Sequence, residues 1–174
     1  MRVIVSLFLF GISNNLVDSN AIGRGWEKAL SEDWTPIISL HRYGDKLYYM
    51  GTQFTATWHQ ASEFCERIHM TLVTIRSREE NERIFKYIRE ASKGYQYWTG
   101  GSRLVDGYNW LWLAYGETID YTNWGAGEPG NINEKCLQLW WRRNSLEWND
   151  RHCDTRFYFI CERSKSLPGV GGTF

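Results

Sequence analysis

Hydrophobic residues recur at helical spacing in two stretches of the chain. The first begins at the capping-box pair Thr57 and Gln60 and predicts a helix that runs to about Ile68. The second begins at a similar pair, Ser77 and Glu80, and is predicted to end at Gly94. The expected inward-facing residues are Ala61, Phe64, Cys65 and Ile68 in the first helix and Ile84, Phe85 and Ile88 in the second.

Short stretches rich in aromatic and β-branched residues predict strands around these helices. They lie at residues 46–54, 97–99, 110–113, 136–141, 146–148 and 157–162. Residues 116–135 follow no regular pattern and contain several Gly and Pro residues, so we expect a long loop there. The pattern as a whole predicts an α+β domain with two helices, a small antiparallel sheet and one long loop.

The first residues of the chain resemble an export signal. A charged start at Arg2 is followed by an apolar run at residues 3–12 and by polar residues from Ser13. An apolar run of about ten residues is too short for a hydrocarbon core of roughly 30 Å, and no second run is long enough to span a membrane. We expect a secreted, extracellular protein with a signal peptide at 1–21, an extension at 22–45, one domain at 46–163 and a flexible tail at 164–174.

Composition narrows the possible partners and cofactors. Lys and Arg total 20 and Asp and Glu total 20, so the net charge gives no reason to expect a nucleic acid or an anionic membrane surface. The cysteines contain no C-x-x-C pair of the kind that structural zinc sites use, and an even number in an exported domain indicates disulfides. They are Cys65, Cys136, Cys153 and Cys161, for which three pairings are possible.

Oxygen-bearing side chains precede two of these cysteines in a pattern that suits a metal ion. They are Glu128 and Glu134 before Cys136, and Asn149 and Asp150 before Cys153. A bond between the two cysteines would bring both groups together. Carboxylate and amide oxygens are the ligands that calcium prefers. The alternative interpretation is that these residues are solvated loop and turn positions.

Five motifs, in order along the chain, resemble the C-type lectin domain. They are residues 97–101 (YWTGG), 124–129 (WGAGEP), 134–136 (EKC) and 148–150 (WND), followed by the last two cysteines. The resemblance covers about residues 47–162. It implies a C-type lectin-like fold with a long calcium-binding loop region and the disulfides Cys65–Cys161 and Cys136–Cys153.

The resemblance also implies a function, a calcium-dependent carbohydrate-binding lectin. The calcium ligands would be Glu128, Glu134, Asn149 and Asp150, with a cis peptide between Glu128 and Pro129. Two adjacent sugar hydroxyls would complete the coordination of the ion and form charge-assisted hydrogen bonds with the same side chains. A second calcium is not expected, because Arg103 and Lys135 stand where further acids would be needed.

Gly130 departs from the family pattern, in which an Asn or Asp supplies a further ligand. Either Asn131 or a water molecule could fill that position. Glu128 is closer to the mannose-type triplet than to the galactose-type one, and both sugar classes stay open. The alternative to a lectin is a calcium-independent C-type lectin-like module that binds a protein or another surface.

Catalysis is not expected, because His41, His59, His69 and His152 are scattered and no G-x-S-x-G or H-E-x-x-H motif occurs. The aromatic set Trp98, Trp110, Trp112 and Trp148 is expected in the core and not at a ligand platform. Trp140 and Trp141 are adjacent, so in a strand one ring should face outward, where it could stack on a sugar.

Overall fold

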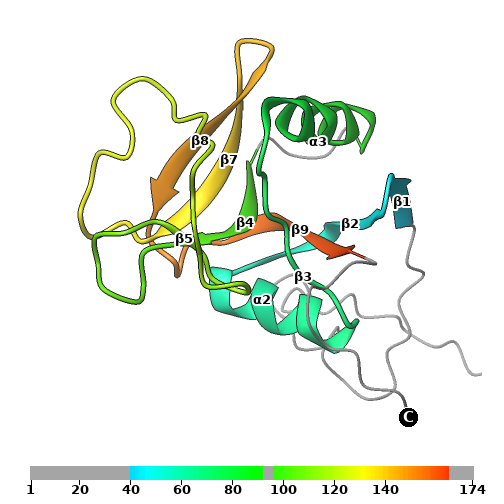
Figure 1. The fold of residues 1–174 in the computed structure, drawn as a ribbon, viewed down its shortest axis with the longest axis horizontal. Helices are drawn as coiled ribbons and strands as arrows, with labels where there is room; N and C mark the ends of the chain where they lie inside the picture. Colours follow the sequence, from blue (N-terminus) through cyan, green and yellow to red (C-terminus); the bar gives the residue numbers. More distant parts are fainter. Residues whose placement is uncertain (1–39, 92–95, 165–174) are drawn as a thin grey trace, which may run out of the picture.

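A computed structural model describes residues 40–91 and 96–164 of the chain (Figure 1). The predicted signal peptide, residues 22–39 of the predicted extension, the helix end at Gly94 and residues 165–174 of the predicted tail lie outside the described residues. Within them, no helix is sufficiently long and apolar to cross a bilayer.

The first predicted helix is present as α2 (Trp58–Arg67). Thr57 is its N-cap, and the capping box is complete, because the side chains of Thr57 and Gln60 each accept a hydrogen bond from the other's backbone N–H. The helix ends at Arg67 with Ile68 as its C-cap, close to the predicted end at about Ile68. Three of the four predicted inward residues, Ala61, Phe64 and Cys65, are buried.

The second helix is α3 (Arg78–Ala91), and it begins with half of the predicted capping box. The hydroxyl of Ser77 accepts the backbone N–H of Glu80 at 3.2 Å. The Glu80 carboxylate instead accepts the backbone N–H of Arg76 at 2.8 Å and the side chains of Lys46 and Tyr48. The expected reciprocal bond is replaced because the partly buried Lys46 competes for the same carboxylate.

The strands form one mixed sheet with the order β1-β2-β9-β4-β5-β6, in which β3 pairs with β9, and β7 pairs with β4 and β8. The described strands are β1 (Leu40–Tyr43), β2 (Lys46–Ala56), β3 (Thr71–Leu72), β4 (Gln96–Ser102), β5 (Leu111–Trp112), β6 (Glu117–Thr118), β7 (Cys136–Arg142), β8 (Ser145–Arg151) and β9 (Phe157–Ser164). Their pairs are antiparallel except for β4 with β9, which is parallel. β1 lies inside the predicted extension and pairs with β2.

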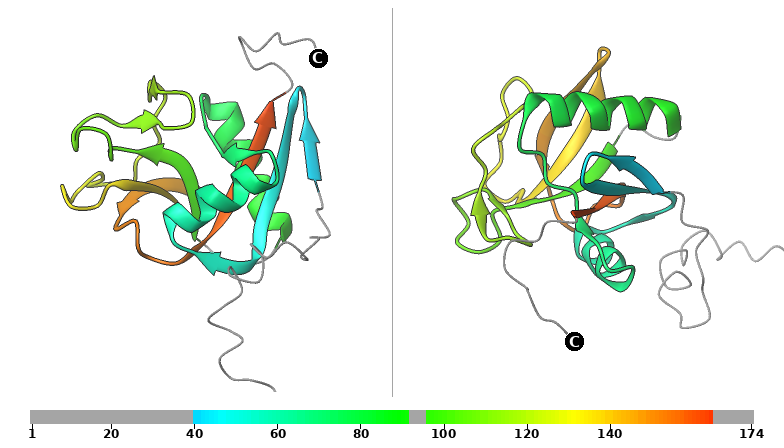
Figure 2. Two further views of the ribbon diagram at one scale, coloured as in Figure 1. Left: turned by 90° about the horizontal axis from the view of Figure 1, so that it is seen from below. Right: turned by 45° about the vertical axis from the view of Figure 1, so that its right-hand side comes forward.

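The two helices lie on opposite sides of the central strands β2, β9 and β4 (Figures 1 and 2). On one side, α2 packs Phe64 against Phe159 of the sheet, with ring centroids 5.1 Å apart. On the other, Ile84 and Ile88 of α3 belong to a second apolar cluster that contains Trp148. Trp98, Trp112 and Trp148 are fully buried, as predicted, whereas Trp110 is only partly buried.

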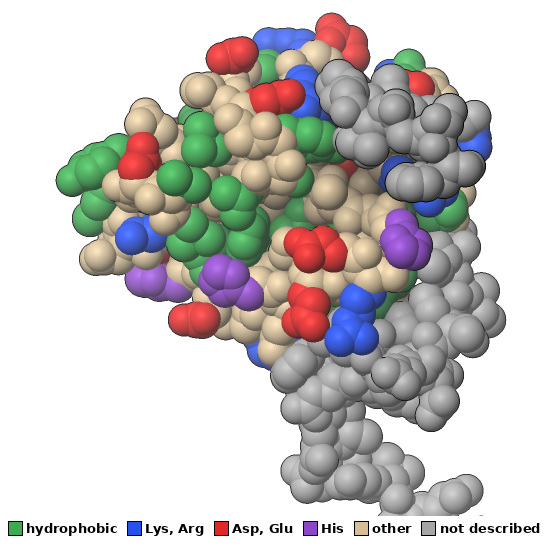
Figure 3. Space-filling model, turned by 60° about the horizontal axis from the view of Figure 1, so that its bottom comes forward, with side chains coloured by type: hydrophobic (Ala, Val, Ile, Leu, Met, Phe, Trp, Pro, Cys, Tyr) green, Lys and Arg blue, Asp and Glu red, His purple; other side chains and the backbone are tan. Residues whose placement is uncertain are grey.

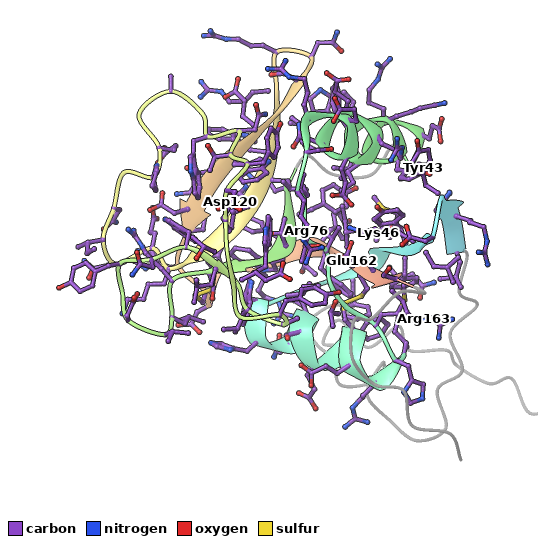
Figure 4. The ribbon with its side chains drawn as sticks, in the orientation of Figure 1. Tyr43, Lys46, Arg76, Asp120, Glu162 and Arg163 are labelled. Atoms are coloured by element: carbon purple, nitrogen blue, oxygen red, sulfur yellow. A yellow bond between two sulfur atoms is a disulfide. The ribbon has the colours of Figure 1, made fainter. Side chains whose placement is uncertain are left out.

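A buried ionic cluster links α3 to the sheet. Lys46 of β2 donates to Glu80 of α3 and, at 3.1 Å, to Glu162 of β9, whose side chain is completely buried (Figure 4). Thr74 donates to the second oxygen of Glu162. Burial raises the pKa of Glu162, and the nearby Lys46 charge opposes that rise.

Both disulfides have the pairing that the family resemblance implies. Cys65 of α2 is bonded to Cys161 of β9, with Cα atoms 5.5 Å apart. Cys136, the first residue of β7, is bonded to Cys153, just after β8, with Cα atoms 5.3 Å apart. The first bond ties a helix to the sheet, whereas the second closes the β7–β8 end, beside the long loop.

Candidate functional site

The candidate site forms where the loop before β7 meets the end of β8. Successive side chains of a strand point to opposite faces, so Asn149 and Asp150 have different surroundings. The Asn149 amide donates to Gln138 of β7 at 3.0 Å. The fully buried Asp150 carboxylate faces the loop and accepts the backbone N–H groups of Gly130 at 3.1 Å and Asn131 at 3.3 Å.

Glu128 meets Asp150 at a shared donor. Its carboxylate also accepts the Gly130 N–H, at 2.9 Å, so that one backbone group serves both acids. Burial raises the pKa of Glu128, and the nearby Asp150 and Glu134 charges raise it further. The peptide bond before Pro129 is cis, as the resemblance implies.

Glu134 belongs to this group, and its carboxylate also approaches two partly or fully exposed basic side chains. Its carboxylate lies 3.5 Å from Arg151 and 3.8 Å from His152. Within residues 40–91 and 96–164, no three His, Cys, Asp or Glu side chains already converge as a metal shell. The structure thus brings Glu128 and Asp150 together at one backbone N–H and holds Asn149 through Gln138, and the Glu134 charge is near enough to raise the pKa of Glu128.

The donor set suits a hard cation on chemical grounds. Glu128, Glu134 and Asp150 contribute anionic oxygens, and their mutual repulsion is what a bound cation would relieve. Asn149 uses its amide nitrogen toward Gln138, which leaves its carbonyl oxygen as a potential ligand. These are the residues that would hold a calcium ion.

Gly130 and Asn131 occupy the position where the sequence departs from the family pattern. The Asn131 side chain is exposed, and its oxygen accepts the backbone N–H of Asn133 at 3.0 Å, so it is engaged within its own loop. Gly130 does not adopt a left-handed backbone conformation. A Cβ atom there would lie 3.1 Å from the Glu128 carboxylate and 3.2 Å from the Gly127 carbonyl.

Arg103 is a central residue of the site that sequence reasoning saw only as an obstacle to a second calcium. Its guanidinium contacts the carboxylate of Asp150 at 2.9 Å, the carbonyl of Glu134 at 2.9 and 3.2 Å, and the carbonyl of Asn131. The only signal in the sequence was a cation after the YWTGG motif, which does not reveal what the cation binds.

The two adjacent tryptophans of β7 have different neighbours, but both are partly buried and both border one surface hollow, so neither stands out as the single outward ring expected from the sequence. Trp141 packs edge-on against Phe85 of α3, with centroids 5.6 Å apart. Trp140 carries the Arg142 guanidinium 4.5 Å from its ring centroid and lines a surface hollow of about 510 Å³, which Trp141 and Tyr158 also border. On the molecular face of Figure 3, acidic and basic side chains are interspersed, in keeping with the balanced net charge.

Comparison with known proteins decides the family. The Lectin C-type domain family matches residues 54–163. The chain belongs to the C-type lectin domain family. Perlucin of Haliotis laevigata is 28% identical over 130 residues, which cover 74% of this chain and 83% of perlucin. A perlucin-like protein of Mytilus galloprovincialis is 33% identical over 106 residues, covering 60% and 68% of the two chains.

Solved C-type lectin structures confirm the α+β fold. The carbohydrate-recognition domain of the mouse scavenger receptor C-type lectin is 34% identical with a TM-score of 0.63, and the match covers 74% of this chain and 97% of that one. A SPL-1 complex with GlcNAc is 28% identical with a TM-score of 0.65, covering 73% and 93%. This C-type lectin domain therefore belongs to a family of generally non-enzymatic carbohydrate-binding modules.

Proposed function

We propose that this C-type lectin domain is a secreted, calcium-dependent carbohydrate-binding lectin. One calcium ion would be held by Glu128, Glu134, Asn149 and Asp150. The observation that carries the proposal is the meeting of the Glu128 and Asp150 carboxylates at one backbone N–H, with Glu134 close enough to raise the pKa of Glu128. Acids held so close together favour a bound divalent cation.

The side chains of the site would also orient the sugar. Calcium supplies coordination positions for two adjacent sugar hydroxyls. Glu128 and Glu134 would accept hydrogen bonds from those hydroxyls, which are charge-assisted. One amide hydrogen of Asn149 goes to Gln138, which fixes the side chain, and the second is available to a hydroxyl oxygen.

Relatives of known structure support carbohydrate as the ligand class. The SPL-1 structure is a complex with GlcNAc. The cow CD23 domain, 28% identical to this chain with a TM-score of 0.63, was solved in the presence of a GlcNAc2Man3 oligosaccharide. Both mannose-type and galactose-type sugars fit the proposal, with mannose favoured by Glu128.

Secretion and the domain limits belong to the same proposal. Two disulfides within one small domain suit an oxidising, extracellular compartment. We infer a signal peptide at 1–21 and a carboxy-terminal tail, whose start moves from residue 164 to 165 because β9 includes Ser164. The pairing of β1 with β2 supports an amino-terminal domain limit near Leu40 in place of residue 46.

One observation favours a second candidate function, a calcium-independent module that binds a protein or another surface. Arg103 already occupies one oxygen of Asp150, and Gly130 supplies no side-chain ligand. If Arg103 takes the place of a metal ion at Asp150, the domain would recognise its partner through the surface of the loop, without calcium.

Calorimetric titration and sugar-affinity chromatography test the proposal. The protein should bind one calcium ion, be retained on a mannose or galactose resin and elute with a chelator. Glu128→Gln should weaken calcium binding roughly tenfold or more, because one charged ligand is lost. Glu82→Gln, an exposed substitution on α3, is the matched control and should bind like the wild type.

Two results would contradict the proposal in different ways. No calcium uptake at millimolar concentration, together with retention that ignores the chelator, would favour the calcium-independent module. Uptake of two ions would show that a second site exists despite Arg103 and Lys135.

A further inference from the structure

Arg103 is a buried cation at the junction of two loops and a strand. Its side chain is 8% exposed. It comes from the segment just after β4, and its guanidinium reaches the long loop at Asn131 and Glu134 and the strand β8 at Asp150. The guanidinium also lies 5.0 Å from the centroid of the Trp110 ring.

Arg103 forms hydrogen bonds with three backbone carbonyl groups of the loop. Two of its acceptors are the main-chain carbonyls of Asn131 and Glu134, and its own backbone N–H donates to the carbonyl of Lys135 at 3.0 Å. The Asn131 carbonyl also accepts the backbone N–H of Glu134 at 2.9 Å, so the guanidinium adds a charged hydrogen bond to that turn. Because it also binds the Glu134 carbonyl, it cross-links residues 131 and 134 and favours the folded position of this segment.

Charge balance indicates the same role. The Glu128, Glu134 and Asp150 carboxylates carry three negative charges, and Arg103 is the cation in hydrogen-bonding contact with one of them inside the cluster. With Arg103 the cluster has a formal charge of about −2, which one divalent ion would neutralise. Arg151 and His152 approach Glu134 from the solvent side at longer distances.

We propose that Arg103 is a built-in structural cation that holds residues 130–135 in their folded position without a metal ion, so that calcium is needed for ligand binding and not for folding of the loop. The part that concerns calcium rests on the proposed function. The part that concerns the loop rests on the Arg103 contacts alone.

Hydrogen exchange of the loop amides, measured on the full chain by mass spectrometry, tests the proposal. The reporters are the N–H groups of Gly130, Asn131 and Glu134, which are hydrogen-bonded within the site. In chelator, the wild-type peptide that contains them should stay protected. In Arg103→Gln it should exchange roughly tenfold faster or more, because several charged hydrogen bonds are lost. Added calcium should restore part of the protection.

Matched variants separate this role from a general effect of charge. Arg151→Gln removes another positive charge from the same cluster, but its side chain is 42% exposed and touches Glu134 only at 3.5 Å, so loop exchange should be unchanged. Arg103→Lys keeps the charge without the planar fork and should give intermediate exchange. Amides of α2 report in each sample whether the rest of the domain is folded.

Several outcomes would overturn the proposal. Wild-type loop amides that exchange at unstructured rates in chelator would show that a metal orders the loop. An Arg103→Gln loop as protected as the wild type would show that the guanidinium is dispensable. If Arg103→Gln does not fold, the wild type in chelator and Arg103→Lys still decide. Absence of calcium uptake by the wild type would contradict the proposed function. The hydrogen-exchange result would still decide whether Arg103 holds the loop in its folded position.

Discussion

At the scale of single residues, Gly130 is where this chain departs from the lectin pattern. Its backbone N–H is shared by two acids, yet it has no side chain to contribute to a metal or a sugar. The neighbouring Asn131 was the sequence-based candidate to replace the missing ligand. In the structure its side-chain oxygen is bonded within the loop, which favours a water molecule at the missing position.

Gly130→Asn should strengthen binding to mannose-type sugars by roughly tenfold, because it adds a neutral oxygen ligand and a donor for a hydroxyl. The backbone permits the change, since Gly130 is not left-handed, and the nearest obstacle is the movable Glu128 carboxylate, with the Gly127 carbonyl close behind. Glycan-array binding with and without chelator is the measurement. Gly130→Ala adds the same Cβ atom without the oxygen and should give no gain; equal gains for both would exclude coordination as the cause.

Asn131→Ala distinguishes the two ways of filling the missing position. We expect a smaller loss of calcium affinity than for Glu128→Gln, because the Asn131 oxygen already serves the Asn133 N–H. Titration of both variants with calcium checks this. Complete loss of calcium-dependent sugar binding in Asn131→Ala would instead assign the ligand role to Asn131.

At the scale of elements, features that depend on residues close in sequence were predicted correctly, whereas features that depend on contacts between distant segments were not. The bounds of α2 followed from Thr57 and Gln60, because capping depends on residues close in sequence. The two-residue strands β3 and β6 and the parallel pairing of β4 with β9 were not predicted, since they depend on contacts between distant segments. Glu80 was misassigned for the same reason: its partner Lys46 lies far away in the sequence.

The two disulfides should differ in what they stabilise. Cys136–Cys153 closes a span of 17 residues beside the site, whereas Cys65–Cys161 closes one of 96. By loop entropy these contribute about 3 and about 4.7 kcal/mol at most. Replacing Cys136 and Cys153 by Ala should cause the larger loss of sugar binding and the smaller loss of unfolding free energy. Replacing Cys65 and Cys161 by Ala should cause the larger loss of unfolding free energy and the smaller loss of sugar binding. Chemical denaturation and resin retention measured on both variants check this; parallel losses would contradict it.

The Lys46 cluster predicts a strong effect on stability far from the candidate site. Lys46→Met should destabilise the domain by about 3–5 kcal/mol, because it leaves the buried Glu162 without its cation. The loss should shrink as the pH falls, since burial raises the pKa of Glu162 and a protonated carboxyl no longer needs a charged partner. Urea denaturation at two pH values measures this.

Two further variants control the Lys46 experiment. Lys86→Met on α3 removes an exposed lysine, whose side chain is 74% exposed, and should change little. Adding Glu162→Gln to Lys46→Met should recover part of the lost stability. A Lys46→Met protein as stable as the wild type would mean that the ion pairs of Lys46 make no net contribution to the free energy of unfolding.

At the scale of the whole molecule, the fold was more predictable than the site. The motifs indicated the family, its disulfides and the residues near the proposed calcium, since all of these follow from residue identity and order. Their mutual contacts could not be predicted, because they depend on the conformation of the loop between β6 and β7, residues 119–135. Arg103 shows this most clearly: its partners come from two other segments.

Burial of aromatic residues throughout the core predicts how the whole domain responds to alkali. Burial raises the pKa of Tyr49 to about 12, and burial with the neighbouring Tyr158 raises that of Tyr97 to about 12. Below about pH 10 both the folded and the unfolded chain keep these phenols protonated. Between about pH 10 and pH 12 the unfolded chain loses the protons first, so stability should fall by about 1.4 kcal/mol per pH unit for each such tyrosine.

Tyr49→Phe is the matched variant for this prediction. The Tyr49 hydroxyl is buried and has no hydrogen-bond partner within the described residues, so its removal should not reduce stability at neutral pH. The variant should lose less stability than the wild type between about pH 10 and pH 12, because one differential titration is gone. Urea midpoints followed across this range, with phenolate absorbance as a second probe, measure the difference. Identical slopes for the two proteins would mean that Tyr49 ionises in the folded state as it does in the unfolded chain, and that its burial does not protect the phenol.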